Sequence, residues 1–265
     1  MNHTKKHQQL ALLVVAAALL ATPMAQADVV TDWNTTAIDI VVTANLPPPP
    51  TNRVITMVQA AVYEAVNAIT QRYPGDRVKL DAAPGASVDA AVAAANRAML
   101  SKLLPLQQAA IDRAYQTAVS ALPDGPAKTG GIAVGEQAAT ALFTLRADDG
   151  AAVPESYRPH TTPGLYVPTV IPIAPQWPQR KPWVMASADQ FRPGPPPNLT
   201  SDLWARDYNE IKTLGAKNST TRSAEQTAIA HFWETGRPMI YSQVAGSAAP
   251  PWPRQWRHRV PGYLS

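Results

Sequence analysis

The sequence predicts an all-α protein, a helical bundle with a long, ordered, proline-rich loop. Two observations favour this fold class. Apolar residues recur at intervals of three and four in several long segments, which is the spacing of one helix face. No run alternates apolar and polar residues as a half-buried strand does. With 46% hydrophobic residues among 265, the chain has enough apolar material for one sizeable core or two small ones.

The first 27 residues have the features of a secretion signal. Lys5 and Lys6 provide a positive end, and residues 10–21 form an apolar run too short to cross a bilayer as a mature helix. Residues 25–27 match the Ala-x-Ala cleavage pattern. We expect cleavage between Ala27 and Asp28. The mature chain should then be secreted or periplasmic, with no membrane span left.

Charge and cysteine content exclude several functions. Loss of the signal removes two lysines and lowers the formal charge from +4 to +2, so the mature domain is less basic than the pI of about 9.4 for the whole chain indicates. We expect no nucleic-acid partner, because no basic patch interleaved with aromatic residues occurs before the last dozen residues. The absence of cysteine excludes disulfides, thiol chemistry and zinc sites built on C-x-x-C.

Four helices are predicted between residues 52 and 145. Residues 52–71 have an apolar face and follow the sequence LPPPP, which we interpret as a helix stop. Residues 87–104 are rich in alanine, with Ser87 as the expected N-cap. Residues 106–122 end at the sequence PDGP. Residues 127–145 contain three glycines, which lower helix propensity but permit close helix packing.

Residues 150–200 hold twelve of the 27 prolines, which excludes a continuous helix. Trp177, Trp183 and several aliphatic residues lie among these prolines, and disordered linkers are poor in such residues. We therefore expect an ordered loop that wraps the bundle and is held by its aromatic side chains. The alternative is a solvated polyproline II linker between domains. Helices are predicted to resume near Ser201 and at Ser223, where Ser223 and Gln226 match a capping box.

Histidines offer the first candidates for chemistry. Three remain after the signal: His160 in the loop, His231 on a predicted helix and His258 near the C-terminus. His231 and Glu234 share one side of their helix, but a catalytic zinc site needs about three protein ligands, and no H-E-x-x-H motif is present. We interpret His231 as a packed or half-exposed helix residue.

Other candidate residues have simpler structural interpretations. Asp148 and Asp149 are adjacent rather than face-paired, and with Gly150 they indicate a helix end. The seven tryptophans are more typical of core or loop anchors than of a binding platform. From the residues alone we predict no catalytic, cofactor-binding or metal-binding side chain.

Several blocks of the sequence occur in the order found in a known family. They are "DVVTDWNTTAIDIVVTAN" (residues 28–45), "RVITMVQAAVYEAVNAI" (53–69) with "YPG" just after it, and "RSAEQTAIAHFWETG" (222–236). This part of the chain, to about residue 244, resembles bacterial vanadium-dependent haloperoxidase-like proteins of the type 2 phosphatidic acid phosphatase superfamily. The resemblance implies a mainly helical protein. Its full-length members hold vanadate or a substrate phosphate with lysine, arginine, backbone N–H groups and a histidine, and a second histidine serves as acid–base.

The catalytic motifs of that family, K-x6-R-P, P-S-G-H and S-R-x5-H-x3-D, are absent. Three arginines precede a proline: Arg158, Arg192 and Arg237. The residues seven positions before them are Ala151, Met185 and Ala230. Ser-Gly-His does not occur, and Glu225 and Thr235 flank His231 where arginine and aspartate are required. The resemblance thus implies the N-terminal helical part of such a domain, residues 28–248, without its C-terminal catalytic helices. No vanadate or other cofactor is expected for this chain.

Residues 249–265 differ in composition from the rest. The sequence APPWPRQWRHRVPGYLS is rich in arginine, proline and tryptophan, whose codons are GC-rich, and contains no acid. We interpret this tail as the product of a frameshift near residue 248. The alternative is a genuine basic tail.

Three functions therefore compete. The chain is an exported fragment of a haloperoxidase- or phosphatase-like protein that is inactive as it stands, or a free-standing periplasmic binding or structural protein, or a half-enzyme completed by a separately encoded C-terminal chain. The first predicts apolar helix faces left uncovered. The second predicts a closed core with a polar exterior. The third predicts a neighbouring reading frame with the missing motifs. A homo-oligomer or that separate half is the partner expected.

Overall fold

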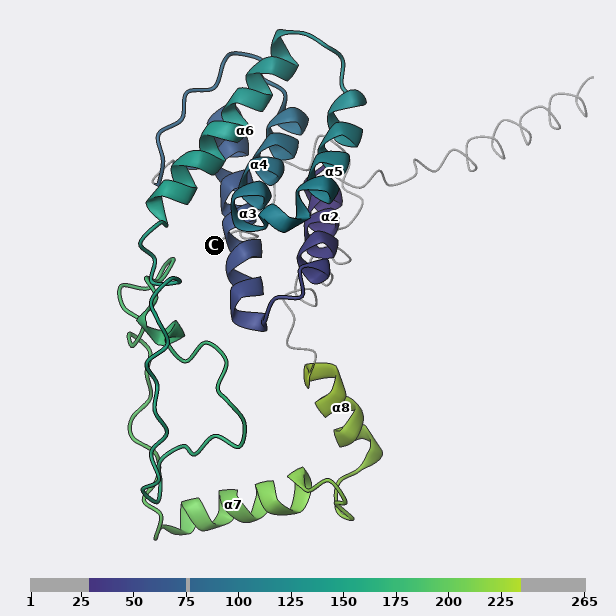
Figure 1. Ribbon diagram of the computed structural model, residues 1–265. Coiled ribbons are helices and arrows are strands. Elements are labelled where there is room, and N and C mark those ends of the chain that lie inside the picture. Colours follow the sequence, from purple (N-terminus) through teal and green to yellow (C-terminus); the bar gives the residue numbers. More distant parts are fainter. Residues whose placement is uncertain (1–28, 75–76, 235–265) are drawn as a thin grey trace, which may run out of the picture.

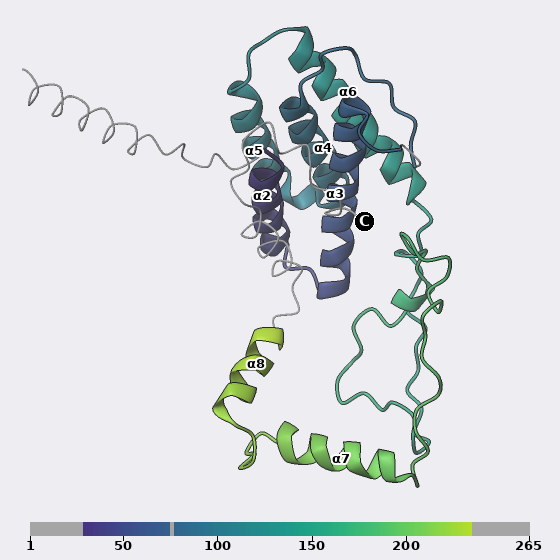
Figure 2. The same cartoon turned by 180° about the vertical axis from the view of Figure 1, so that it is seen from behind.

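A computed structural model describes residues 29–74 and 77–234, and within these ranges all regular structure is helical. Five helices form a bundle: α2 (Val29–Thr43), α3 (Pro48–Thr70), α4 (Val88–Leu103), α5 (Gln108–Ser120) and α6 (Pro126–Leu145) (Figures 1 and 2). Two more, α7 (Asp202–Gly215) and α8 (Ala224–Glu234), lie away from the bundle. The predicted all-α class is confirmed. The predicted signal, the tail, Arg237 and His258 lie outside the described residues.

Helix α4 forms the centre of the bundle. It packs against α2, α3, α5 and α6, and residues 90–95 are all buried, although successive residues of a helix point in different directions. Alanine at five of these six positions lets the surrounding helices approach α4 closely. The predicted N-cap is confirmed, because the Ser87 hydroxyl accepts a hydrogen bond from the backbone N–H of Ala90 at 3.2 Å.

Helix α6 packs on α4 through two glycines one turn apart. A Cβ built on Gly131 would lie 2.2 Å from the Ser87 carbonyl oxygen, and one on Gly135 would lie 2.3 Å from that of Ala91. Both neighbours are backbone atoms of the first turns of α4. The expectation that the glycines of this segment permit close packing is therefore confirmed for Gly131 and Gly135.

The N-terminal helices differ from the prediction in two respects. The proline run does not stop a helix before residue 52, because Pro48, Pro49 and Pro50 form the first turn of α3. A first turn needs no N–H donors, so proline fits there. Helix α2 was not predicted from periodicity, since its threonines and valines are modest helix formers. Burial of Trp33 and its apolar neighbours compensates for that weak propensity.

The proline-rich loop contacts the bundle at one place and does not wrap it. Within residues 150–200, all of them described, Trp183 is the side chain that packs against the core, close to the short 3-10 helix η2 (Trp177–Gln179). Elsewhere Val170, Ile171 and Phe191 are exposed. Prolines lie between these apolar residues and prevent them from forming a continuous helix. The loop therefore has no continuous apolar face with which to cover the bundle. Another 3-10 turn, η1 (Pro105–Gln107), connects α4 to α5.

Both helices beyond the loop begin as their sequences predict. Ser201 caps α7 by accepting a hydrogen bond from Trp204 N–H at 3.2 Å. At α8, the Ser223 N–H donates to Gln226 Oε1 at 2.9 Å and the Gln226 N–H donates to Ser223 Oγ at 3.1 Å, which is the predicted capping box. Across the described part of the chain, no helix is both long and apolar enough to cross a membrane.

Candidate functional site

The histidines and carboxylates of the described residues form no metal centre. No group of three or more potential ligands from His, Asp and Glu lies together in residues 29–74 and 77–234. His160 and His231 are both exposed, one in the loop and one on α8. His231 is therefore a surface residue rather than a packed one.

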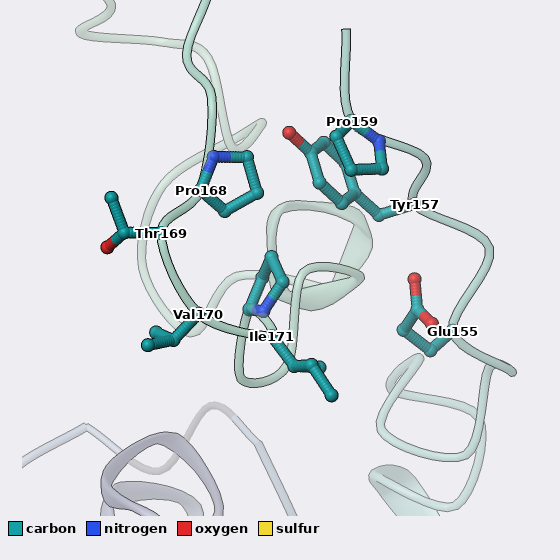
Figure 3. Close-up of a pocket in the computed structure, with 8 residues that line it drawn as sticks. Glu155, Tyr157, Pro159, Pro168, Thr169, Val170 and Ile171 are labelled. Carbon is teal, nitrogen blue, oxygen red and sulfur yellow. The ribbon is translucent and has the colours of Figure 1, made fainter.

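The described arginines that precede prolines, Arg158 and Arg192, lie on the exposed loop and line neither of the two hollows described below. Arg158 is 79% exposed and pairs with Glu155 at 3.9 Å, and Arg192 lies on the exposed loop. A hollow of about 460 Å³ lies beside this part of the loop, lined by Tyr157 and Pro159 on one side and by residues 168–172 on the other (Figure 3). Glu155 is its one charged lining residue. The hollow therefore offers no cation for an oxyanion.

A buried carboxylate surrounded by three arginines is the most concentrated polar group in the described structure. Asp149 is 1% exposed, and its Oδ2 accepts hydrogen bonds from Arg53 Nε at 2.9 Å and from Arg180 Nη2. Arg146 Nη2 lies 3.6 Å from the same oxygen. We call Asp149, Arg53, Arg146 and Arg180 the Asp149 cluster.

Local chain geometry places Asp149 at the centre of this cluster. Helix α6 ends at Leu145, and Gly150 follows with a left-handed φ of +84°. A Cβ at Gly150 would lie 3.2 Å from the Arg180 Cα, so glycine permits this close approach of the loop. The Asp149 carbonyl accepts a hydrogen bond from Lys181 N–H at 3.0 Å, and Asp149 Oδ1 accepts one from Ala151 N–H at 3.0 Å.

The cluster keeps the carboxylate ionised. Burial alone raises the pKa of Asp149, but hydrogen bonds from Arg53 and Ala151 and the charges of Arg53 and Arg180 outweigh burial, so the pKa lies below its usual value. Burial lowers the pKa of the Arg146 guanidinium below its ordinary value, and the charge of Asp149 opposes that change. With the pKa of Asp149 lowered, its carboxylate stays ionised at neutral pH, so it provides charge and position rather than acid–base catalysis.

Arg146 and Asp149 join the loop to the bundle. The Arg146 guanidinium donates to the carbonyl of Pro182 at 3.1 Å and to that of Lys181 at 2.5 Å, and its Cζ lies 4.4 Å from the centre of the Trp183 ring. The predicted anchoring of the loop by aromatic residues is thus correct for Trp183. The anchor itself consists of an ion cluster as well as an indole.

A second hollow lies beside the cluster. It has a volume of about 400 Å³ and opens to solvent. Its lining is Trp177, Arg180, Lys181, Pro182, Trp183, Val184, Met185 and Ala188, which we call the tryptophan hollow. Arg180 belongs to both the hollow and the Asp149 cluster, and its Cζ lies 4.5 Å from the centre of the Trp177 ring.

Sequence patterns did not point to the Asp149 cluster. Arg53 and Arg180 lie 96 and 31 positions from Asp149 along the chain, so no local spacing connects them. The one local signal is that Arg146 lies three positions before Asp149 and that Gly150 follows Asp149 directly. Comparison with protein-family models, with curated proteins and with solved structures gives no match to this chain.

Proposed function

We propose that this chain is the exported N-terminal scaffold of a vanadium haloperoxidase- or phosphatase-like protein and has no turnover of its own. The proposal rests on the sequence blocks at residues 28–45, 53–69 and 222–236, together with the absence of the family's catalytic motifs. In full-length members, catalytic helices supply the histidines and the oxyanion-binding lysine. Here they would come from polypeptide outside residues 28–248.

Uncovered apolar side chains on α7 and α8 are the observation that carries this proposal. Ile211 is 72% exposed, and Phe232 and Trp233 are 54% and 62% exposed. On α7, Trp204, Tyr208 and Ile211 occur at intervals of four and three, the spacing of one helix face. Such a face on two neighbouring helices is typical of a surface that another polypeptide covers.

The bundle favours a free-standing protein, whereas the two outer helices favour a part of a larger enzyme. The core of α2 to α6 is closed, as a free-standing binding or structural protein would require. Helices α7 and α8 add no described residue to that core. A free-standing protein has no need of these exposed faces, so we favour completion by catalytic helices, either in a longer chain or in a separate one.

We expect the α7 and α8 faces to bind a neutral hydrophobic dye. Nile red fluorescence should rise on addition of the purified protein and fall to roughly half or less in the double variant Ile211→Gln, Phe232→Gln, because the change removes the two apolar contacts from the surface. Nile red carries no charge, so the arginine cluster does not attract it.

Leu106→Gln is the matched control for this measurement. Leu106 is 95% exposed but lies singly on η1 of the bundle. Dye binding that responds as strongly to Leu106→Gln as to the double variant would refute a specific surface on α7 and α8. Absence of dye binding together with a monodisperse monomer would favour the free-standing protein instead.

We expect the purified protein to show no catalytic turnover. With added vanadate and peroxide it should not oxidise bromide, and it should not hydrolyse p-nitrophenyl phosphate. Loss of one oxyanion donor typically lowers the rate by about a hundredfold or more, and here the nucleophile, the acid–base histidine and the motif lysine are all absent from the sequence. An active vanadium haloperoxidase assayed in parallel serves as the control. Turnover that disappears on His231→Ala would overturn the proposal.

A further inference from the structure

Positive charge is in excess around the tryptophan hollow. Arg53, Arg146 and Arg180 share the single carboxylate of Asp149, and exposed Asp148 is the further acid that acts on Arg146. Lys181 adds a fourth cation at the edge of the hollow. Arg77 lies over the Trp183 ring of the hollow as a fifth cation. The cations near the hollow thus outnumber the two carboxylates that act on them, and a partly desolvated excess of this kind favours binding of an anion.

The guanidinium groups also retain unused hydrogen-bond donors. Arg146 is 5% exposed, yet its Nε has no hydrogen-bond partner among the described residues, and the same is true of Arg180 Nε. Arg180 Nη2 is occupied by Asp149, whereas no hydrogen bond of the described chain engages Nη1. A guanidinium that lines an open hollow and has a free Nη donor can donate hydrogen bonds to a second carboxylate.

The remaining lining of the hollow is apolar and aromatic. Trp177, Trp183, Pro182 and Met185 supply most of it, and both indoles are half-buried. Arg180 lies over the Trp177 ring, and Arg146 and Arg77 both lie over the Trp183 ring, at 4.4 and 5.8 Å from its centre. A volume of about 400 Å³ lies in the range of small-molecule sites, which combine apolar walls with a few polar groups. A bare inorganic ion would leave these walls without a contact.

We propose that the tryptophan hollow binds a small aromatic carboxylate. The ring of the ligand lies against Trp177, Trp183 and Met185, and the carboxylate accepts hydrogen bonds from Arg180 and pairs with Lys181. A carboxylate suits this site because its two oxygens match the planar guanidinium. The binding site is separate from the chemistry proposed for the full-length family, so either proposal can fail without the other.

Benzoate is the probe, measured by titration calorimetry on the purified protein. We expect saturable binding with a Kd of about 0.1–1 mM, which is usual for a ligand of this size. Benzyl alcohol keeps the ring without the charge, acetate keeps the charge without the ring, and inorganic phosphate tests a general anion site. Each of these three should bind at least about tenfold more weakly, because each lacks one of the two required interactions.

Lys181→Met tests the site without disturbing the fold. Its backbone N–H donates to the Asp149 carbonyl, a bond that methionine keeps, and its side chain is exposed. The variant should weaken benzoate binding about fivefold, as expected for an exposed charge pair, with an unchanged melting temperature. Lys212→Met on α7 is the matched control and should leave the affinity unchanged. Arg180→Met should abolish binding but also loosen the loop.

Three results would overturn the proposal. The first is benzoate binding that does not saturate by about 20 mM, well above the expected range. The second is equal affinity for benzyl alcohol, acetate or phosphate. The third is an affinity that Lys181→Met does not change.

Discussion

Gly135→Ala is expected to destabilise the bundle by about 3 kcal/mol, at the upper end of the usual range for overpacking. The new methyl group would lie 2.3 Å from the Ala91 carbonyl oxygen and 2.8 Å from the Ala95 nitrogen. Both are backbone atoms of α4, so no side-chain rotation relieves the clash and the two helices must separate. The better helix propensity of alanine recovers at most about 1 kcal/mol.

Gly130→Ala is the matched control, because Gly130 lies on the same helix, next to Gly131 and five positions before Gly135. Its Cβ would meet the Ala83 and Ala86 methyl groups at 3.4 and 3.5 Å, which is ordinary contact. We expect this variant to be as stable as the parent or up to about 1 kcal/mol more stable. Urea denaturation followed by circular dichroism at 222 nm measures both. A Gly135→Ala protein with the stability of the parent would show that α6 is not held against α4 by backbone contact.

The positions of most helices could be predicted because their signals are local. Ser87, Ser201 and Ser223 cap helices whose first turns follow within three residues, so each boundary is present in a short stretch of sequence. The apolar spacing of residues 52–71 likewise locates α3. The proline run before it was misinterpreted because proline both ends helices and begins them, and only the backbone after it distinguishes the two.

The path of the loop and the Asp149 cluster could not be predicted for a different reason. Asp148 and Asp149 do follow the end of α6, as their position before Gly150 indicates. However, the partners of Asp149 come from α3 and from the loop beyond η2, and only the tertiary fold brings these segments together. Aromatic content identified Trp183 as an anchor but could not show that most of the loop leaves the bundle.

Asp149→Asn is expected to release the loop from the bundle, at a cost of about 3 kcal/mol in the stability of that contact. Removing one partner of a buried ion pair typically costs about 3–5 kcal/mol, and the lower value applies because Arg53 is 16% exposed and can regain water. The variant keeps the shape of the side chain but leaves three arginines without their carboxylate. Such a loss corresponds to roughly a hundredfold increase in the population of molecules with the loop detached from the bundle. Trypsin should therefore cleave after Arg180 roughly a hundredfold faster than in the parent.

The pH dependence of the difference between Asp149→Asn and the parent shows whether lost charge or altered packing releases the loop. Because the folded pKa of Asp149 lies below the unfolded value of about 3.9, its ionisation stabilises the protein above pH 4, and that stabilisation is lost as the pH falls through the folded pKa. The difference in cleavage rate between Asp149→Asn and the parent should therefore be constant from about pH 5 to 8. Trypsin is inactive in acid, so the melting temperatures of the two proteins are compared there, and they should converge as the pH falls below about 4.

Asp148→Asn is the control that isolates the buried carboxylate. Asp148 adjoins Asp149 but is exposed, so its substitution should change stability by no more than about 0.5 kcal/mol and leave cleavage after Arg180 unchanged. If both asparagine variants loosen the loop equally, general charge at the end of α6 holds it, and the specific contacts of Asp149 with Arg53 and Arg180 do not. If the melting temperatures of Asp149→Asn and the parent stay apart at low pH, the loss comes from packing around the amide, and the ionic anchor is refuted.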